Sequence, residues 1–214
     1  MNLTHFEWLL FDFDNTLVDF NASSKEAFVK VMTPLIDQDP KELYPIYNKI
    51  NHLCWDEREA GLISHDELKV KRWNMFFDKI DIKYDPLTAN NIYFEVIKTN
   101  PYWIDGAVDL LKAIQDKYRS FIITNGLSEV QNPRAEILGL AEYFEHIIIS
   151  DEIGIAKPQK GFFDHCDKAR QVFARLISAQ ADDIAGTALY LCSRAGAWTC
   201  GHIIVLDGGM TAKY

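Results

Sequence analysis

The 214-residue chain has few cysteines and no long apolar segment. Its four cysteines form no Cys-x-x-Cys pair and are too sparse for the disulfide framework of a small secreted protein, so we expect a reducing, cytoplasmic environment. No apolar run approaches the ~18 residues that span a bilayer. Residues 1–16 lack the positively charged segment and cleavage site of a signal peptide. These absences predict a soluble, unprocessed protein without a membrane partner.

Positive charge is also scarce. The 22 Lys and Arg residues are outnumbered by 31 Asp and Glu residues, which gives a formal net charge of -9. Broad contact with a nucleic-acid polymer or an anionic membrane needs a surplus of positive charge and is therefore disfavoured. An anionic small molecule would need local compensation from a metal, a lysine or backbone amides. A hydrophobic content of 48% with 25% charged residues indicates an ordered globular protein with a sizeable core.

The most informative segment lies where the first apolar run ends. Asp12 and Asp14 follow Trp8-Leu9-Leu10-Phe11, so two carboxylates close a predicted buried strand. Residues two apart in a strand project from the same face, which places like charges side by side if the strand continues to Asp14. A cation or a proton must relieve this repulsion, and Mg²⁺ prefers oxygen ligands of this kind. A strand followed by an Asx turn is the simpler alternative.

After this strand the pattern becomes helical for about 80 residues. Two Ser-x-x-Glu capping boxes, at Ser23 and Ser64, predict helix starts, and Pro40 predicts another. From Pro101 onward helices alternate with short apolar strands at 121–124 and 147–150, which is typical of a parallel sheet with crossover helices. A helix is expected between these strands, over about 127–138, with an interruption at Pro133 as an open alternative.

Three segments are expected to meet, because functional groups in open α/β sheets gather at the carboxyl ends of strands. In chain order they are Asp12-Phe13-Asp14-Asn15-Thr16, Ile123-Thr124-Asn125-Gly126 and Ala156-Lys157-Pro158. Together they resemble the motifs of the haloacid dehalogenase-like hydrolase superfamily, over about residues 1–166. The resemblance implies an α/β fold, a three-layer Rossmann-like parallel sheet core with an inserted helical cap. Residues 1–20 and 99–214 would form the core, and 21–98 the cap.

The resemblance also implies a chemistry. Asp12 would attack phosphorus to form an aspartyl-phosphate, while Asp14 would protonate the leaving oxygen and later activate water. Thr124 would hold the phosphoryl group and Lys157 would offset its charge. The simpler alternatives are that Thr124 is an ordinary hydroxyl at a strand end and that Lys157 is a solvated surface lysine. Mg²⁺ would be held by Asp12 and Asp14. The residues expected to contact the substrate are Asn15, Thr16, Asn125 and Gly126.

Asp14 separates two chemistries within the superfamily. True haloacid dehalogenases need the nucleophile but no acid for an alkoxide leaving group, and in the resemblance they usually lack this second aspartate. A phosphatase is therefore favoured. The segments 125–131 and 150–154, with Arg134, resemble the pyrimidine 5′-nucleotidase branch. The expected substrate is a nucleoside monophosphate or a similar small phosphorylated metabolite.

The predicted cap is rich in aromatic residues. They could form a wall on which a base stacks, but several fall on apolar helical stripes, so packing within the cap explains most of them better. The aromatic residues in question are Tyr44, Tyr47, Trp55, Trp73, Phe76, Phe77 and Tyr93. The run Lys69-Val70-Lys71-Arg72 could contact a phosphate or ribose, but a solvated helix face is the favoured interpretation.

The superfamily's fourth motif, a strand ending in Gly-Asp with a second acid nearby, is not found after Lys157. Residues 170–214 instead resemble the C-terminal end of short-chain dehydrogenases, through the segments 181–193 and 201–209. The apolar run 203–206 ends at Asp207, which could replace the missing metal ligand if that run joins the sheet. Asp182 and Asp183 compete for this position but fit a helix N-terminus better.

Competing functions stay open at this point. A phosphate-binding or interaction protein that lost catalysis with the fourth motif is the first alternative. An NAD(P)-dependent oxidoreductase is less favoured, because no Gly-rich dinucleotide loop follows the first strand and no Tyr-x-x-x-Lys pair is found. The matching dehydrogenase segment commonly lies between subunits, so the C-terminal tail also makes a homodimer plausible.

Overall fold

The computed structural model describes residues 8–173. Three parallel strands form the sheet in the order β1-β2-β3, and their bounds are Trp8–Asp12, Arg119–Thr124 and His146–Ile149. Asp12 pairs in register with Ile123, and Thr124 with Ile149. Parallel pairing therefore brings the carboxyl ends of all three strands to one edge of the sheet, as the sequence predicts.

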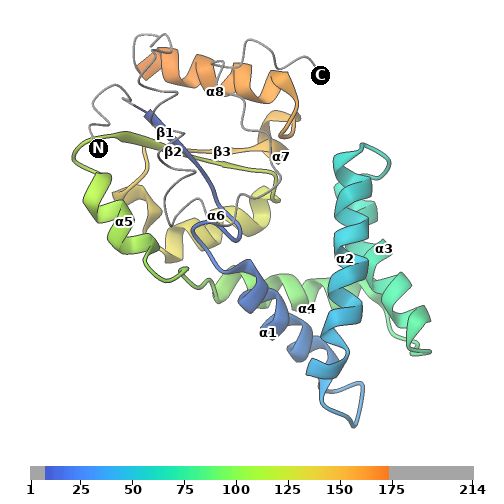
Figure 1. Cartoon of the computed structure of the whole chain (residues 1–214). Helices are drawn as coiled ribbons and strands as arrows, with labels where there is room; N and C mark the ends of the chain where they lie inside the picture. Colours follow the sequence, from blue (N-terminus) through green and yellow to red (C-terminus); the bar gives the residue numbers. More distant parts are fainter. Residues whose placement is uncertain (1–7, 174–214) are drawn as a thin grey trace, which may run out of the picture.

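Helices cover both faces of this sheet (Figure 1). Successive β2 side chains point to opposite faces, so Ile122 packs in one apolar cluster while Phe121 and Ile123 pack in another. The first cluster includes residues of α5 (Ala107–Ile114) and α6 (Ser128–Ile137), and the second includes residues of α8 (Lys160–Phe173). The three-layer α/β core is confirmed. Short elements, η2 (Leu140–Glu142) and α7 (Ser150–Ile153), flank β3.

A second group of helices is inserted between β1 and α5 and lies beside the layered core (Figure 1). We call this group the cap. Its side chains form an apolar cluster of their own, in which Phe28, Trp73 and Phe76 are fully buried. The inserted helical cap is therefore confirmed. Its elements are α1 (Phe20–Met32), η1 (Pro40–Glu42), α2 (Tyr44–Glu59), α3 (His65–Lys79) and α4 (Pro86–Thr99).

The two predicted capping boxes have different outcomes. Ser64 caps α3 as predicted, with reciprocal hydrogen bonds between Ser64 and Glu67. The prediction for Ser23 is wrong, because Asp19 caps α1 by accepting a 2.9 Å hydrogen bond from the backbone of Ala22. The helix has already begun when the chain reaches Ser23, so this side chain is buried and donates to the backbone carbonyl of Asn100 at 2.8 Å.

Two proline predictions also need adjustment. Pro40 begins the short η1, and α2 starts only at Tyr44. Pro133 does not interrupt α6, which continues to Ile137. A proline removes one donor from the helix, but the following turn still closes through hydrogen bonds such as that from Leu138 to the Arg134 carbonyl, at 3.0 Å.

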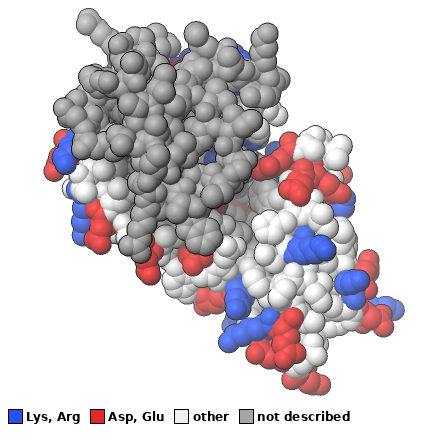
Figure 2. Space-filling model, in the orientation of Figure 1, with Lys and Arg blue, Asp and Glu red and all other residues white. Residues whose placement is uncertain are grey.

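The described part of the chain also bears on surface and membrane properties. Within residues 8–173, every helix is too short or too polar to pass through a bilayer. Figure 2 shows acidic and basic side chains interspersed over the visible face of the cap. The segment 174–214 lies outside the described residues, and with it Asp182, Asp183, Asp207 and the predicted homodimer contact.

Candidate active site

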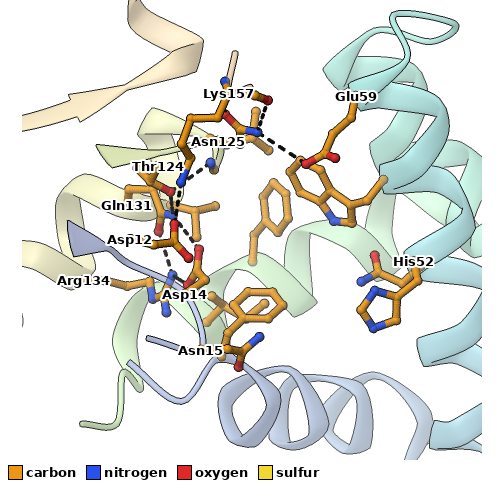
Figure 3. Close-up of a pocket in the computed structure, with 18 of the residues that line it drawn as sticks. Asp12, Asp14, Asn15, His52, Glu59, Thr124, Asn125, Gln131, Arg134 and Lys157 are labelled. Atoms are coloured by element: carbon orange, nitrogen blue, oxygen red, sulfur yellow. Dashed lines mark hydrogen bonds and ion pairs between the residues drawn. The ribbon is translucent and has the colours of Figure 1, made fainter. Parts of the chain in front are cut away.

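The predicted motif residues meet at the carboxyl edge of the sheet, where they line one cavity of about 570 Å³. Asp12 comes from the end of β1, Thr124 from the end of β2, and Lys157 from the loop after α7. Figure 3 shows Asp12 and Asp14 next to each other, with Lys157 reaching toward them. Residues 145 positions apart in sequence thus share one site, because parallel strands end at one edge.

Asp12 and Lys157 form an ion pair. The Lys157 Nζ lies 2.6 Å from Asp12 Oδ1 and also donates to the Ile123 backbone carbonyl at 3.0 Å. The Asp12 side chain is 45% exposed, so it stays accessible from the cavity. Thr16 donates to the other carboxylate oxygen, Oδ2, at 3.3 Å. The lysine therefore offsets charge at the carboxylate that the motif predicts to be the nucleophile.

Two residues of α6 hold the Asp14 carboxylate by hydrogen bonds. Gln131 Nε2 donates to Asp14 Oδ2 and Arg134 Nη1 to Asp14 Oδ1, each at 2.7 Å. Arg134 also donates to Gln131 Oε1 at 2.6 Å, so the two α6 side chains support each other. Although β1 ends at Asp12, Phe13 is fully buried, and Asp14 lines the same cavity as Asp12. The same-side placement of the two carboxylates agrees with the prediction, but α6 rather than a continuing strand fixes it.

Thr124 is oriented by the backbone turn that follows β2. Its Oγ1 accepts hydrogen bonds from the Gly126 N–H at 3.1 Å and from Gln131 Nε2 at 2.8 Å. Both bonds use the hydroxyl as an acceptor, which leaves its own proton to donate toward the cavity. Gly126 has a steric reason to be glycine, since a Cβ there would lie 2.1 Å from Gln131 Nε2.

Asn125 ties the β2 end to the Lys157 loop. Its side chain accepts from the Lys157 N–H at 2.8 Å and donates to the Lys157 carbonyl at 2.9 Å. This reciprocal pair fixes the backbone that carries the lysine. The same amide lies 3.3 Å from Glu59 Oε1, and Figure 3 shows Glu59 extending from the cap toward Asn125.

Three of the four residues predicted to contact the substrate line the cavity, and one does not. Asn15, Asn125 and Gly126 line the cavity. Asn15 has a positive φ of 58° and accepts a 3.2 Å hydrogen bond from the Asn21 N–H, which ties the motif to the start of α1. Thr16 is exposed, is not among the cavity-lining residues, and contacts Asp12 instead.

The cap supplies the opposite wall of the cavity. Apolar rings, amides and charged side chains face the sheet edge across it, and Figure 3 shows His52 and Glu59 on that side. Trp55, Tyr93 and Phe94 are the cap α2 and α4 rings on this wall. Tyr44, Tyr47, Trp73, Phe76 and Phe77 do not line the cavity and pack in the cap cluster. All seven predicted aromatic residues pack in the cap cluster, and of these Trp55 and Tyr93 also line the cavity.

Arg72 departs from the interpretation that 69–72 is a solvated helix face. Its side chain is only 1% exposed, and it lines the cavity. The guanidinium lies over the rings of Tyr93 and Phe94, at 4.8 and 5.1 Å from their centroids. Lys69 instead pairs with Glu129 of α6 at 2.6 Å. The helical period turns Arg72 inward, because only part of a four-residue run can face solvent.

One further contact joins the cap to the core. His65, the first residue of α3, lies 2.8 Å from Asp151 of α7. Asp151 also accepts hydrogen bonds from the backbone and hydroxyl of Ser128. Burial alone would raise the pKa of Asp151, but these donors and His65 lower it overall. Burial, aided by the nearby Arg58, lowers the pKa of His65 although Asp151 opposes the shift.

Sequence comparison assigns this geometry to a family. The model of the haloacid dehalogenase-like hydrolase family matches residues 6–169, which contain all three motifs. The chain belongs to the haloacid dehalogenase-like hydrolases. The predicted family is thereby confirmed.

Curated relatives of this hydrolase agree with the assignment. The chain is 30% identical over 161 residues to the pyrimidine 5′-nucleotidase YjjG of Escherichia coli, a match that covers 74% of this chain and 69% of the relative. It is 28% identical over 160 residues to the pyrimidine 5′-nucleotidase PynA of Streptococcus pneumoniae, covering 74% and 68%.

Solved structures of haloacid dehalogenase-like hydrolases share the fold. One of them is YfnB of Bacillus subtilis, described as a putative HAD-hydrolase bound to magnesium. It superposes with a TM-score of 0.69 at 27% sequence identity, and the match covers 76% of this chain and 71% of the YfnB chain. The L-2-haloacid dehalogenase of Xanthobacter autotrophicus gives a TM-score of 0.60 at 11% identity, covering 77% and 64%. The second likeness supports the fold alone.

The donor set of this hydrolase fits Mg²⁺ in part. Asp12 and Asp14 present carboxylate oxygens to the cavity, and a hard cation prefers such ligands. Within residues 8–173, no group of three or more His, Cys, Asp and Glu side chains is placed to hold a metal. Residues 8–173 would thus provide two carboxylates to a Mg²⁺ ion. Water, together with any residue from 174–214, would have to supply the remaining ligands.

Sequence reasoning did not assign several residues of this site. In the sequence, Gln131 and Arg134 carry only the resemblance to the nucleotidase branch, yet in the structure they hold Asp14. Their spacing of three on the helix after β2 puts both on one face, which is the signal that could have found them. The cap residues Asn51 and Glu59 carried no motif at all, because their position depends on how the cap packs.

Proposed function

We propose that this hydrolase is a Mg²⁺-dependent phosphomonoesterase that works through a phosphoryl group on Asp12. One observation carries the proposal: Asp12 and Asp14 lie together at the sheet edge, facing a cavity, with Lys157 at 2.6 Å from Asp12. A carboxylate nucleophile beside an acid and a cation is the arrangement that phosphoryl transfer through a covalent intermediate needs.

In the first half-reaction, an Asp12 oxygen forms a bond to phosphorus while the ester P–O bond breaks. Asp14 gives its proton to the departing oxygen, so the leaving group departs as an alcohol. Thr124 donates its remaining O–H proton to a phosphoryl oxygen, and Lys157 offsets charge that builds on the phosphoryl group and Asp12. Gln131 and Arg134 keep the Asp14 carboxyl aimed at the leaving oxygen.

In the second half-reaction, water replaces the leaving group. Asp14 now takes a proton from water, whose oxygen forms a bond to phosphorus as the bond to Asp12 breaks. Inorganic phosphate leaves and Asp12 is restored. Mg²⁺, held by Asp12 and Asp14, would neutralise phosphoryl charge during both steps.

We propose nucleoside monophosphates, with a pyrimidine base, as the leading substrates. The names of YjjG and PynA support this class, and so does the cavity, which offers aromatic rings and hydrogen-bonding groups across from the phosphoryl site. Other relatives named glyceraldehyde 3-phosphate phosphatases, such as that of Pyrococcus furiosus at 26% identity, make a small phosphorylated aldehyde the competing substrate. The apolar area of the cavity favours the larger, ring-bearing compound.

Phosphate release tests this function. The full chain is assayed with phenyl phosphate, uridine monophosphate and glyceraldehyde 3-phosphate, each with Mg²⁺ and with a chelator. We expect Mg²⁺-dependent release, with the highest kcat/KM for the nucleotide. If none of them releases phosphate at any Mg²⁺ concentration, the result would favour the alternative of a phosphate-binding protein. That alternative agrees with a metal site to which residues 8–173 contribute two carboxylates and no third ligand of this kind.

Two predictions about 174–214 stay predictions. Asp207 is proposed as the third metal carboxylate, and Asp207→Asn should weaken Mg²⁺ activation while Asp182→Asn should not. The tail is also proposed to form a homodimer, which sedimentation of the full chain at several concentrations would detect.

A further inference from the structure

Arg72 is a buried cation whose surroundings are neutral. Its Nη1 donates to Asn51 Oδ1 at 3.1 Å, and its Nη2 donates to Asn90 Oδ1. No carboxylate among residues 8–173 pairs with it, and Tyr93 and Phe94 cover its faces. A buried charge is costly unless its donors are satisfied, and the Arg72 Nε has no hydrogen-bond partner among the described residues, so the two asparagine oxygens are the acceptors that hold this charge.

The arginine fixes which way the Asn51 amide faces. An arginine side chain carries only donors, so the Asn51 oxygen must point toward Arg72 and its Nδ2 group must point away. Asn90 is oriented in the same way, but its Nδ2 is buried and has no hydrogen-bond partner among the described residues. Asn51 lines the cavity, and no described residue accepts a hydrogen bond from its Nδ2. Of these two amides, Asn51 is therefore the one whose donor can reach a ligand.

The position of this donor matters as much as its chemistry. Asn51 belongs to the cap α2, across the cavity from the sheet edge that carries Asp12. A substrate whose phosphoryl group lies at Asp12 would extend its leaving group toward that wall. Trp55 and Phe94 line the same wall and give a planar ring apolar surface to contact.

We propose that Asn51 determines substrate specificity by donating to a ring carbonyl of the leaving group, and that Arg72 is its positioning residue. This inference rests on the proposed phosphatase function and makes its substrate class narrower. A donor at this point suits a uracil- or thymine-type base, which presents carbonyl oxygens on both sides of its imide N–H. A cytosine amino group at the same point would face another donor, and two unsatisfied donors in a partly buried site disfavour binding.

The Asn51→Asp variant tests this inference by replacing the donor with an acceptor of the same shape. We measure kcat/KM for uridine and cytidine monophosphates, and use turnover of phenyl phosphate to show that the variant is folded. The wild type should prefer the uridine nucleotide. In the variant the uridine-to-cytidine ratio should fall by about tenfold or more, mainly through KM. The exposed Asn74→Asp change, on α3 outside the cavity, should leave the ratio as it is.

Each result then has a separate meaning. An unchanged ratio in Asn51→Asp, with phenyl phosphate still hydrolysed, overturns the inference and leaves the phosphatase proposal standing. Failure of the wild type to hydrolyse the two nucleotides, phenyl phosphate and glyceraldehyde 3-phosphate alike overturns the phosphatase proposal itself. If Asn51→Asp does not fold, Asn51→Ser removes the amide with a smaller side chain. It should abolish the preference for uridine, and retention of that preference also overturns the inference.

Discussion

Arg134 is fully buried, and its Nη1 lies 2.7 Å from the Oδ1 of Asp14, whose side chain is 27% exposed. The arginine therefore supports the carboxyl group from the protein side, while the other side of that group faces the cavity. Its guanidinium also lies 4.9 Å from the Phe13 ring centroid, so the residue between the two aspartates packs on it. The position of Asp14 depends on this contact more than on the strand.

Replacing Arg134 by Met should impair catalysis and stability together. Loss of the donor lets Asp14 move away from the leaving oxygen, so kcat should fall at least about tenfold. Because Asp14 is partly solvated, the free energy of unfolding should fall by about 1–3 kcal/mol, less than for a fully buried pair. Urea denaturation and phosphate release measure the two effects. A variant with unchanged kcat would contradict the positioning of Asp14 by Arg134.

Gly126→Ala should impair the site through Gln131. The added Cβ would lie 2.1, 2.6 and 2.9 Å from Nε2, Cδ and Cγ of the buried Gln131, so the whole end of this side chain must move. That movement breaks the contacts of Gln131 with Asp14 and Thr124, so activity should fall about tenfold or more, and the free energy of unfolding should fall by about 1–3 kcal/mol because buried polar groups lose their partners.

A double mutant tests this reason. Gly126→Ala combined with Gln131→Ala should be no slower than Gln131→Ala alone, because the clash then has no target. Additive losses of activity would show that Gly126 acts by some other route.

The partial burial of His65, beside Arg58, predicts a pH dependence of stability. Since folding lowers the pKa of His65, its contribution is complete above the ordinary imidazole pKa of about 6.5 and is lost as the pH falls through the lowered value. The lowered pKa of Asp151 acts in a more acidic window, below the ordinary carboxyl pKa of about 3.9.

The free energies of unfolding of wild type and His65→Gln are compared by urea denaturation between neutral pH and about pH 5. Acidification should destabilise the wild type more than the variant. A difference between the two proteins that is constant or grows on acidification would be inconsistent with a lowered His65 pKa. Exposed His52 offers the matched control, and His52→Gln should track the wild type at every pH.

The sequence predicts what depends on local pattern and on motif order. The strands that end at Asp12 and Thr124 have continuous apolar runs, and parallel pairing then forces their ends together. The Ser64 capping box is likewise local and forms as predicted. The Ser23 prediction fails for a physical reason, since Asp19 is an equally good cap four residues earlier and the helix starts at the first one available.

Long-range packing decides the features that the sequence does not reveal. Arg72 reads as part of a basic surface run, and only the packing of α3 against α2 and α4 shows that it is buried between Asn51 and Asn90. The partners of Asp14 are 117 and 120 positions away, on a helix whose rotation about its axis no local pattern fixes. The spacing of Gln131 and Arg134 places both on one helix face, but only the packed structure shows that this face meets Asp14.

The most direct test of the account maps the covalent intermediate. The full chain is mixed with uridine monophosphate and Mg²⁺, quenched in acid during turnover, digested and examined by mass spectrometry. We predict one phosphoryl group on the peptide that contains Asp12, absent from the Asp12→Asn variant and unaffected by Asp37→Asn in the exposed turn after α1. Turnover without a phosphoryl group on Asp12, or Asp12→Asn at the wild-type rate, would contradict the account.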